Sequence, residues 1–123
     1  MTKCGRYGVT PADFDYSPAT IRASVTRSLA RMHTEYLDAV YLHDVEFVCT
    51  QVGPNEPGDS LVALNEKVAL YGLAKSDEGK IWGEGDGKIL EAVAELRKMQ
   101  EEGLIKYIGI TGVYALITSC MLY

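Results

Sequence analysis

The sequence predicts an α/β protein whose strands form a parallel sheet. Two stretches have the apolar spacing of an amphipathic helix, about 17–33 and 86–102, and each leads into a short apolar run, about 36–43 and 104–110. Neither run alternates cleanly between polar and apolar residues, which is typical of strands buried on both faces. A helix that feeds directly into such a strand is half of a βαβ unit, and here the pattern occurs twice.

The first helix is expected to begin after Ser17 and to end near His33. Ser17 can cap the helix, and Pro18 fits its first turn, where a missing N–H costs nothing. The apolar positions recur every three or four residues and form one stripe: Ile21, Val25, Leu29 and Met32. His33 is expected to be a capping or surface residue, because a cation is favourable at the carboxyl end of a helix.

The second helix is expected to open at Asp86 or Gly87 and to end at Gly103, a residue that suits the left-handed conformation of helix ends. Its apolar stripe is Ile89, Val93, Leu96 and Met99. The glycine-rich stretch 83–88 does not match a phosphate-binding loop, since Trp82 and Ile89 stand where that motif needs glycine and a hydroxyl residue. We interpret it as an acidic loop that leads into the helix.

A long interruption, about 49–85, separates the two helix–strand pairs. It has turn residues at 53–58 and, from Ser60 to about Tyr71, a further possible helix between the two described above. A connection of this length inside a compact domain is usually a functional loop or an insertion. We therefore expect an inserted loop and helix after the second strand.

Composition excludes several classes of function. The chain has 123 residues and a net charge of −5, which argues against a nucleic-acid partner. No run of roughly 18 apolar residues predicts a membrane span, and the N-terminus does not resemble a signal peptide, so we expect a cytoplasmic protein. The three cysteines, Cys4, Cys49 and Cys120, are too widely spaced for a disulfide framework or a zinc site, and no metal is implied. We expect them to be buried or half-buried thiols.

Three polar residues stand at the carboxyl ends of candidate parallel strands. His43 ends the first apolar run, Thr111 follows the second, and Lys3 could end a strand at the N-terminus. Ligand sites in parallel α/β folds lie at this edge of the sheet. Each residue is a weak signal on its own, but together they predict a site.

Several motifs, in order, resemble the aldo-keto reductases. They are Thr2-Lys3, the helix positions Val25, Ser28, Leu29 and Met32, then Tyr36-Leu37-Asp38, Leu42-His43-Asp44, and Glu102-Gly103 with Lys106 and Gly109-Ile110-Thr111. The stretches 3–7, 14–17 and 43–47 are similar to the D-arabinose/L-galactose dehydrogenase branch, in particular to the fungal D-arabinose 1-dehydrogenases. The resemblance covers most of residues 1–112.

The resemblance implies a (β/α)8 TIM barrel, of which this chain would supply about the third to the fifth strand. It implies an NAD- or NADP-dependent oxidation of a small-molecule aldose to its lactone. Lys3 would depress the pKa of a catalytic tyrosine, His43 would orient the substrate oxygen, and Thr111 would bind the nicotinamide carboxamide. Gly112 stands where many members have asparagine. The catalytic tyrosine and its aspartate would lie on strands outside this chain, as would most of the cofactor's phosphate-binding segments.

We therefore expect a partial barrel over 1–112, with the insertion at about 49–85, and a divergent hydrophobic tail over 113–123. The chain is expected to be a truncated product that is inactive alone. An alternative function is a non-catalytic interaction module, since a partial barrel exposes sheet edges that favour self-association. A complete small α/β binding domain is the least favoured possibility.

Overall fold

A computed structural model describes residues 1–53 and 64–112, and its centre is a three-stranded parallel sheet. The strands are β1 (Thr2–Cys4), β2 (Leu37–His43) and β3 (Ile105–Thr111), and they lie side by side in that order. The predicted α/β class with parallel strands is thus confirmed. Within the described residues the sheet does not close, so β1 and β3 are its edges.

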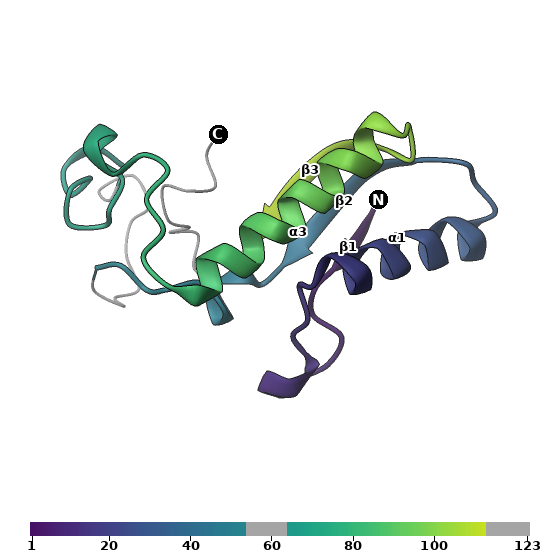
Figure 1. Cartoon of the computed structure of the whole chain (residues 1–123), viewed down its shortest axis with the longest axis horizontal. Coiled ribbons are helices and arrows are strands. Elements are labelled where there is room, and N and C mark those ends of the chain that lie inside the picture. The colour runs from purple at the N-terminus through teal and green to yellow at the C-terminus, as the bar shows by residue number, and fades with distance from the viewer. Residues whose placement is uncertain (54–63, 113–123) are drawn as a thin grey trace.

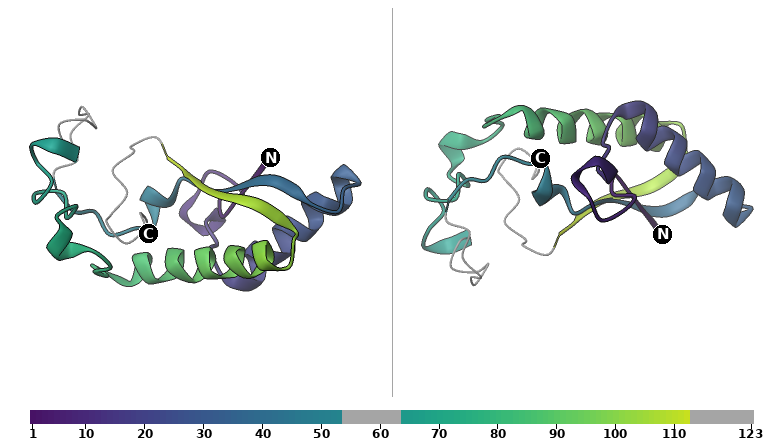
Figure 2. Two further views of the ribbon diagram at one scale, coloured as in Figure 1. Left: turned by 90° about the horizontal axis from the view of Figure 1, so that it is seen from above. Right: turned by 90° about the horizontal axis from the view of Figure 1, so that it is seen from below.

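Two helices connect the strands and cover one face of the sheet (Figures 1 and 2). Helix α1 (Pro18–Met32) joins β1 to β2, and α3 (Glu84–Glu101) precedes β3. Three short 3-10 helices lie in the connections: Pro11–Asp13, Val45–Phe47 and Lys75–Asp77. None of the helices in the described ranges is long and apolar enough to cross a membrane.

The ends of α1 follow the sequence prediction. The Ser17 hydroxyl accepts a hydrogen bond from the N–H of Thr20, and Pro18 occupies the first turn. His33 ends the helix in the left-handed conformation, with a φ of 49°, and is exposed. The apolar stripe is one residue shorter than predicted, because Met32 in the last turn is 46% exposed.

Helix α3 begins at Glu84, two residues before the predicted start. Gly83 is the extended residue before the helix, and Asp86 in the first turn accepts hydrogen bonds from the N–H groups of Trp82 and Gly83. A side chain at the third helical position that accepts from the residue before the helix is one half of a capping box, so these bonds hold the chain in place where α3 begins at Glu84. Gly103 takes the left-handed conformation after the helix, with a φ of 79°, as expected.

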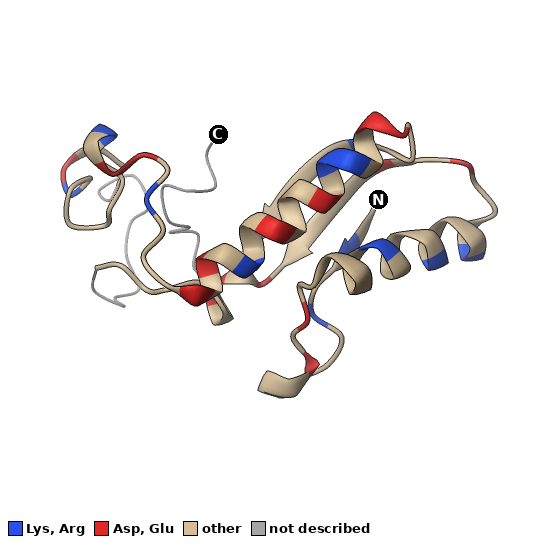
Figure 3. Cartoon of the chain, viewed as in Figure 1, with Lys and Arg blue, Asp and Glu red and all other residues tan. Residues whose placement is uncertain are grey.

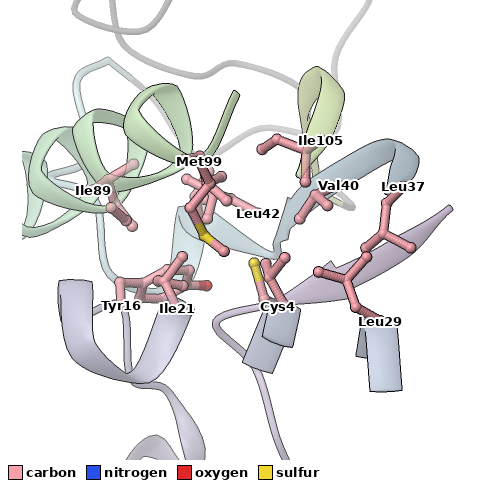
Figure 4. Close-up of a cluster of buried hydrophobic side chains, with 14 residues drawn as sticks. Cys4, Tyr16, Ile21, Leu29, Leu37, Val40, Leu42, Ile89, Met99 and Ile105 are labelled. Carbon is pink, nitrogen blue, oxygen red and sulfur yellow. The ribbon is translucent and has the colours of Figure 1, made fainter. Parts of the chain in front are cut away.

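The hydrophobic core lies between the two helices and the sheet face that they cover (Figure 4). Cys4, Val40 and Leu42 come from the strands, and their side chains pack against both helices. The Cys4 thiol donates to the carbonyl of Tyr41, and burial raises its pKa to about 12. Cys49 is a half-buried thiol, as predicted, and Cys120 lies outside the described residues.

Acidic residues line α3 and basic residues line α1 (Figure 3). One arginine of α1 forms ion pairs with two glutamates at α3 and its C-terminal end. Arg22 of α1 forms an ion pair with Glu95 and a bidentate pair with Glu102, at 2.7 and 2.8 Å. Its hydrogen bonds lower the pKa of the Glu102 carboxyl. The contact fixes how α1 lies against α3.

Among the described residues, the predicted helix from Ser60 to about Tyr71 is helical only at residues 64–65. Residues 60–63 lie outside the described ranges, the helical turn ends at Asn65, and the chain continues as turns to Gly72. Of the apolar residues at helical spacing that the structure describes here, Leu64 is 52% exposed, Val68 is half-buried and Tyr71 is buried. A short helix without a buried face is marginal in water.

Candidate functional site

The carboxyl ends of the three strands bring the predicted site residues together. In the register of the sheet, His43 is the partner of Thr111, and Lys3 is the partner of Tyr41. Partners on adjacent strands share a face, as do residues two apart on one strand. Lys3, His43 and Thr111 therefore lie on one face, opposite the face that the helices cover.

Two boundaries differ slightly from the sequence prediction. Lys3 is the middle residue of β1 rather than its last, because Cys4 still pairs with Leu42. Thr111 is the last residue of β3 rather than the first residue after it. Lys3 is exposed, whereas His43 has 28% of its side chain accessible.

Thr111 carries a buried hydroxyl. Its Oγ1 is inaccessible to solvent and has no hydrogen-bond partner among the residues that the structure describes. A buried hydroxyl without a partner is costly, so such an atom points to a group that is absent here. A Cβ at the neighbouring Gly112 would meet the Glu46 carboxylate, which is the movable end of a flexible side chain.

Asp44 links the ends of all three strands. Its N–H donates to the carbonyl of Thr111 at 2.7 Å, and its carboxylate forms an ion pair with Arg6, which follows β1. The same carboxylate lies 3.4 Å from Nε2 of His43, the residue before it. Asp44 is 4% exposed and has a φ of 57°, in the left-handed region.

Tyr16 supports His43 from the side of the core. Its hydroxyl donates to the main-chain carbonyl of His43, and its ring packs against Gly5. Burial, and secondarily the nearby Asp44 carboxylate, raise the pKa of this phenol. A phenol that stays protonated and is buried in this way holds the main chain and is not poised to transfer protons.

A hollow of about 300 Å³ lies next to this cluster. Its lining is apolar except for Arg6: Val9, Pro11, Phe14, Phe47 and Val48. The Arg6 guanidinium lies 5.5 Å from the centre of the Phe14 ring and 6.0 Å from that of Phe47. The aromatic rings therefore help to hold the guanidinium in place.

The ends of the 50–83 segment are held together by Asp86. Its carboxylate accepts hydrogen bonds from the N–H groups of Thr50 at 2.8 Å, Trp82 at 2.8 Å and Gly83 at 3.1 Å. Gly85 packs so closely on the Val48 carbonyl that a Cβ there would overlap it. The described part of the segment lies beyond the carboxyl ends of the strands (Figures 1 and 2).

Arg6, Asp44 and Tyr16 lie in the motifs that carry the family resemblance, but the sequence analysis assigned none of them a role in the site. Arg6 and Asp44 are 38 residues apart, and no spacing rule joins them. Asp44 had an indirect signal, since it directly follows a strand-end histidine. In the described ranges, no group of three or more His, Cys, Asp or Glu side chains could hold a metal ion.

Comparisons with known proteins agree on one family. The model of the aldo/keto reductase family matches residues 1–121. D-arabinose 1-dehydrogenase of Saccharomyces cerevisiae is 38% identical over 111 residues, and L-galactose dehydrogenase of Arabidopsis thaliana is 29% identical over 112 residues. These matches cover 90% and 91% of this chain, which spans only 22% and 23% of the two relatives.

Solved structures give the same result for the fold. An aldo-keto reductase from Bacillus halodurans in its holo form superposes with a TM-score of 0.51 at 22% identity. The superposition covers 92% of this chain and 26% of that enzyme. At this identity the likeness concerns the fold alone.

Proposed function

Because this chain belongs to the aldo/keto reductase family, we propose that it supplies part of the active site of an NAD(P)-dependent dehydrogenase that oxidises an aldose, such as D-arabinose, to its lactone. The names of the two relatives, a D-arabinose and an L-galactose dehydrogenase, support the substrate class. In this proposal β1, β2 and β3 are about the third to the fifth strand of a (β/α)8 barrel. Residues 1–112 form that part, and 113–123 diverge from it.

The observation that carries the proposal is the register of the sheet. It places Lys3, His43 and Thr111 on the one face that the helices leave uncovered, at or next to the carboxyl ends of three adjacent strands. In a barrel that face is the interior, and its carboxyl end is where active sites form. An ammonium group, an imidazole and a hydroxyl group thus lie close together at the ends of three separate strands.

Each group has a role that fits its chemistry. The ammonium of Lys3 favours the phenolate form of a tyrosine on another strand and so makes that tyrosine a better base. His43 orients the anomeric hydroxyl of the sugar by a hydrogen bond. The described part of the 50–83 segment, whose ends Asp86 holds, lies at the same end and can contact substrate.

The residues present also fit a nicotinamide cofactor. The buried Thr111 hydroxyl has no partner among the described residues, and a primary carboxamide offers both a donor and an acceptor for it. When bound, NAD(P)+ accepts the hydride that leaves the anomeric carbon, while the hydroxyl proton goes to the base and the C–O bond becomes a carbonyl. Thr111 would hold the carboxamide in the orientation that this transfer requires.

The proposal assigns the tyrosine base and its aspartate to strands beyond these 123 residues. Removal of a general acid–base group costs roughly 10²–10⁴-fold in rate. The chain alone is therefore expected to show no turnover.

The test is an assay of the complete open reading frame that contains this segment. D-arabinose and L-galactose are supplied with NAD+ or NADP+, and the absorbance of the reduced nicotinamide is followed. Lys3→Met should lower kcat by at least about 10²-fold, whereas Lys106→Met, a strand lysine paired with Asp38 at the surface, should retain activity. The proposal would be overturned if the two variants were equally active. It would also be overturned if the wild-type protein formed no reduced nicotinamide with either aldose.

A second function follows from the open sheet. Within the described residues β1 and β3 have no outer partner strands, and Tyr107 of β3 is 69% exposed. Such edges favour association with another chain. If the transcript encodes these 123 residues alone, we propose a non-catalytic module that self-associates, and light scattering should then give a mass that rises with concentration. A constant monomer mass would contradict it.

A further inference from the structure

We propose that the hollow beside Arg6 is a subsite for the part of the aldose that does not react. In this subsite the Arg6 guanidinium donates hydrogen bonds to hydroxyls of the sugar, and the rings of Phe14 and Phe47 pack against its C–H faces. The inference rests on the proposed function, because it concerns the substrate of the same site. A binding measurement and a turnover measurement distinguish the failure of one from the failure of the other.

The hollow lies within reach of a sugar whose anomeric end is at His43. The Asp44 carboxylate stands between the two places, since Oδ2 forms the ion pair with Nη1 of Arg6 and Oδ1 lies 3.4 Å from Nε2 of His43. The guanidinium and the imidazole are therefore separated by a single carboxylate group. One sugar molecule is long enough to reach from the imidazole into the hollow.

Two loops form the walls of the hollow, and each follows a strand of the sheet. The loop after β1 and the 3-10 helix after β2 supply the lining: Arg6, Val9, Pro11 and Phe14 from the first, and Phe47 and Val48 from the second. Both loops start at the carboxyl ends of parallel strands, where ligands bind in folds of this class. Small-molecule sites have volumes of about 300–1,000 Å³, so a hollow of about 300 Å³ suits a ligand as small as one sugar.

The loop after β1 is held in shape by its own hydrogen bonds. The N–H of Tyr7 donates to the carbonyl of Asp13 at 2.9 Å, and the N–H of Asp15 donates to the carbonyl of Gly5, also at 2.9 Å. The Asp13 carboxylate accepts from both the N–H and the hydroxyl of Thr10, each at 2.8 Å. A site whose walls are already fixed loses little conformational entropy when a ligand binds.

Arg6 is the polar group of the hollow, and part of its guanidinium is available to a ligand. Its Nε donates to the Gly8 carbonyl at 2.9 Å, and its Nη1 donates to the Asp44 carboxylate. The N–H groups of Nη2 have no partner among the residues that the structure describes. The side chain is 29% accessible, so a ligand can reach these donors.

The charges around Arg6 favour a neutral ligand over an anion. The Asp44 carboxylate, which is only 6% accessible, already balances the positive charge of the guanidinium. The remaining N–H groups need acceptors, and the hydroxyls of a sugar are acceptors without a charge. The other lining residues are apolar, and a sugar ring has polar edges and apolar C–H faces, so it complements both parts of the hollow.

Phe47 offers an open ring face to such a ligand. Its ring is 61% exposed, whereas Phe14 is half-buried, and the two ring centres are 5.5 Å apart with a tilt of 49° between the planes. A sugar in the hollow would cover the exposed ring and remove its apolar surface from water. Because Phe47 is largely outside the core, its replacement tests binding with little effect on the fold.

The experiment measures the binding of D-arabinose to the complete protein. The redox-inert tetrahydro form of NAD is present, so that no turnover competes with the measurement. Saturation-transfer NMR, with irradiation of the aromatic protons of the protein, detects which sugar protons lie near the rings and gives the dissociation constant by titration. We expect the strongest transfer at sugar protons away from the anomeric carbon.

Phe47→Ala should weaken the binding of D-arabinose about tenfold, which is the loss expected when one buried aromatic contact is removed. The matched control is Met32→Ala, which also shortens an exposed apolar side chain. Met32 ends α1 just before β2 begins, and so lies at the opposite end of the strands. Met32→Ala should bind the sugar as the wild type does.

Arg6→Lys tests the guanidinium. Lysine can pair with Asp44, but it lacks the planar set of N–H groups that serves several acceptors at once. The probes are D-arabinoses that each lack one hydroxyl other than the anomeric one. Loss of the hydroxyl that Arg6 contacts should weaken binding to the wild type about tenfold, and it should weaken binding to Arg6→Lys much less.

The subsite is overturned if Phe47→Ala binds D-arabinose as tightly as the wild type, or if the wild type binds no aldose. It is also overturned if each deoxy sugar loses as much affinity for Arg6→Lys as for the wild type. In the turnover assay Phe47→Ala should raise KM about tenfold and change kcat less. A protein that binds D-arabinose through Phe47 but forms no reduced nicotinamide would refute the proposed function and leave the subsite standing.

Discussion

Asp86 gives the sharpest test of how the ends of the 50–83 segment are attached to α3. Its buried carboxylate accepts three main-chain N–H bonds, one on Oδ1 from Thr50 and two on Oδ2 from Trp82 and Gly83. In Asp86→Asn the single side-chain oxygen can keep the two hydrogen bonds from Trp82 and Gly83. The NH2 group then faces the N–H of Thr50, and neither donor has an acceptor.

The magnitude follows from these bonds. A buried donor left without a partner costs about 1–3 kcal/mol, and the other two bonds lose the benefit of a charged acceptor. We expect the free energy of unfolding to fall by about 2–4 kcal/mol. With a urea m-value of about 2 kcal/mol/M, the midpoint should fall by about 1–2 M.

The assay uses two signals from the same urea titration. Far-UV circular dichroism reports the helices, and fluorescence reports Trp82, the single tryptophan, at the affected site. The matched control is Glu84→Gln, two residues earlier on α3, where the side chain is 84% exposed and its ion pair with Lys88 is at the surface. If both variants unfold at the wild-type urea concentration, the account of Asp86 is refuted.

Further predictions concern packing, thiol reactivity and acid stability. Gly85→Ala should destabilise the chain by about 1–3 kcal/mol, because the added Cβ overlaps the Val48 carbonyl. Gly87→Ala should stabilise the chain by about 0.5–1 kcal/mol, because a Cβ at Gly87 meets open space. The urea midpoints of the two variants should therefore shift in opposite directions. Cys4, with its pKa raised to about 12, should resist iodoacetamide between pH 7 and 9 while the half-buried Cys49 reacts, as peptide mass mapping can show. Arg22→Met should lower stability at neutral pH. Because Arg22 lowers the pKa of the Glu102 carboxyl, that difference should shrink as the pH falls below about 4.3, and equal gaps at pH 7 and 3 would refute it.

The elements that the sequence predicted well are those that local chemistry determines. Ser17 and Pro18 start α1, Gly103 ends α3 in the left-handed conformation, and the two apolar runs are β2 and β3. The meeting of His43 and Thr111 followed from strand direction alone, since parallel strands end at one edge. Their catalytic roles stay predictions.

The parts that were not predicted depend on contacts between distant residues. Sequence spacing does not predict that Arg6 pairs with Asp44, because the pairing needs the left-handed turn after β2. Asp86 was expected at the start of the second helix, but the sequence does not show that it is buried, that it accepts three main-chain N–H bonds, or that α3 begins at Glu84. The described part of the predicted helix from Ser60 leaves the helical conformation after Asn65, because helical spacing does not show whether a packing surface exists.

The most direct test of the central claim follows the hydrogen on the anomeric carbon of the sugar. The complete protein is incubated with NAD(P)+ and D-arabinose deuterated at that carbon, and both products are analysed by mass spectrometry. We predict one deuterium in the reduced nicotinamide and an equal amount of lactone, with both products lost in Lys3→Met and retained in Lys106→Met. Nucleotide without deuterium, or equal products from the two variants, would contradict the assignment of Lys3, His43 and Thr111 to a dehydrogenase site.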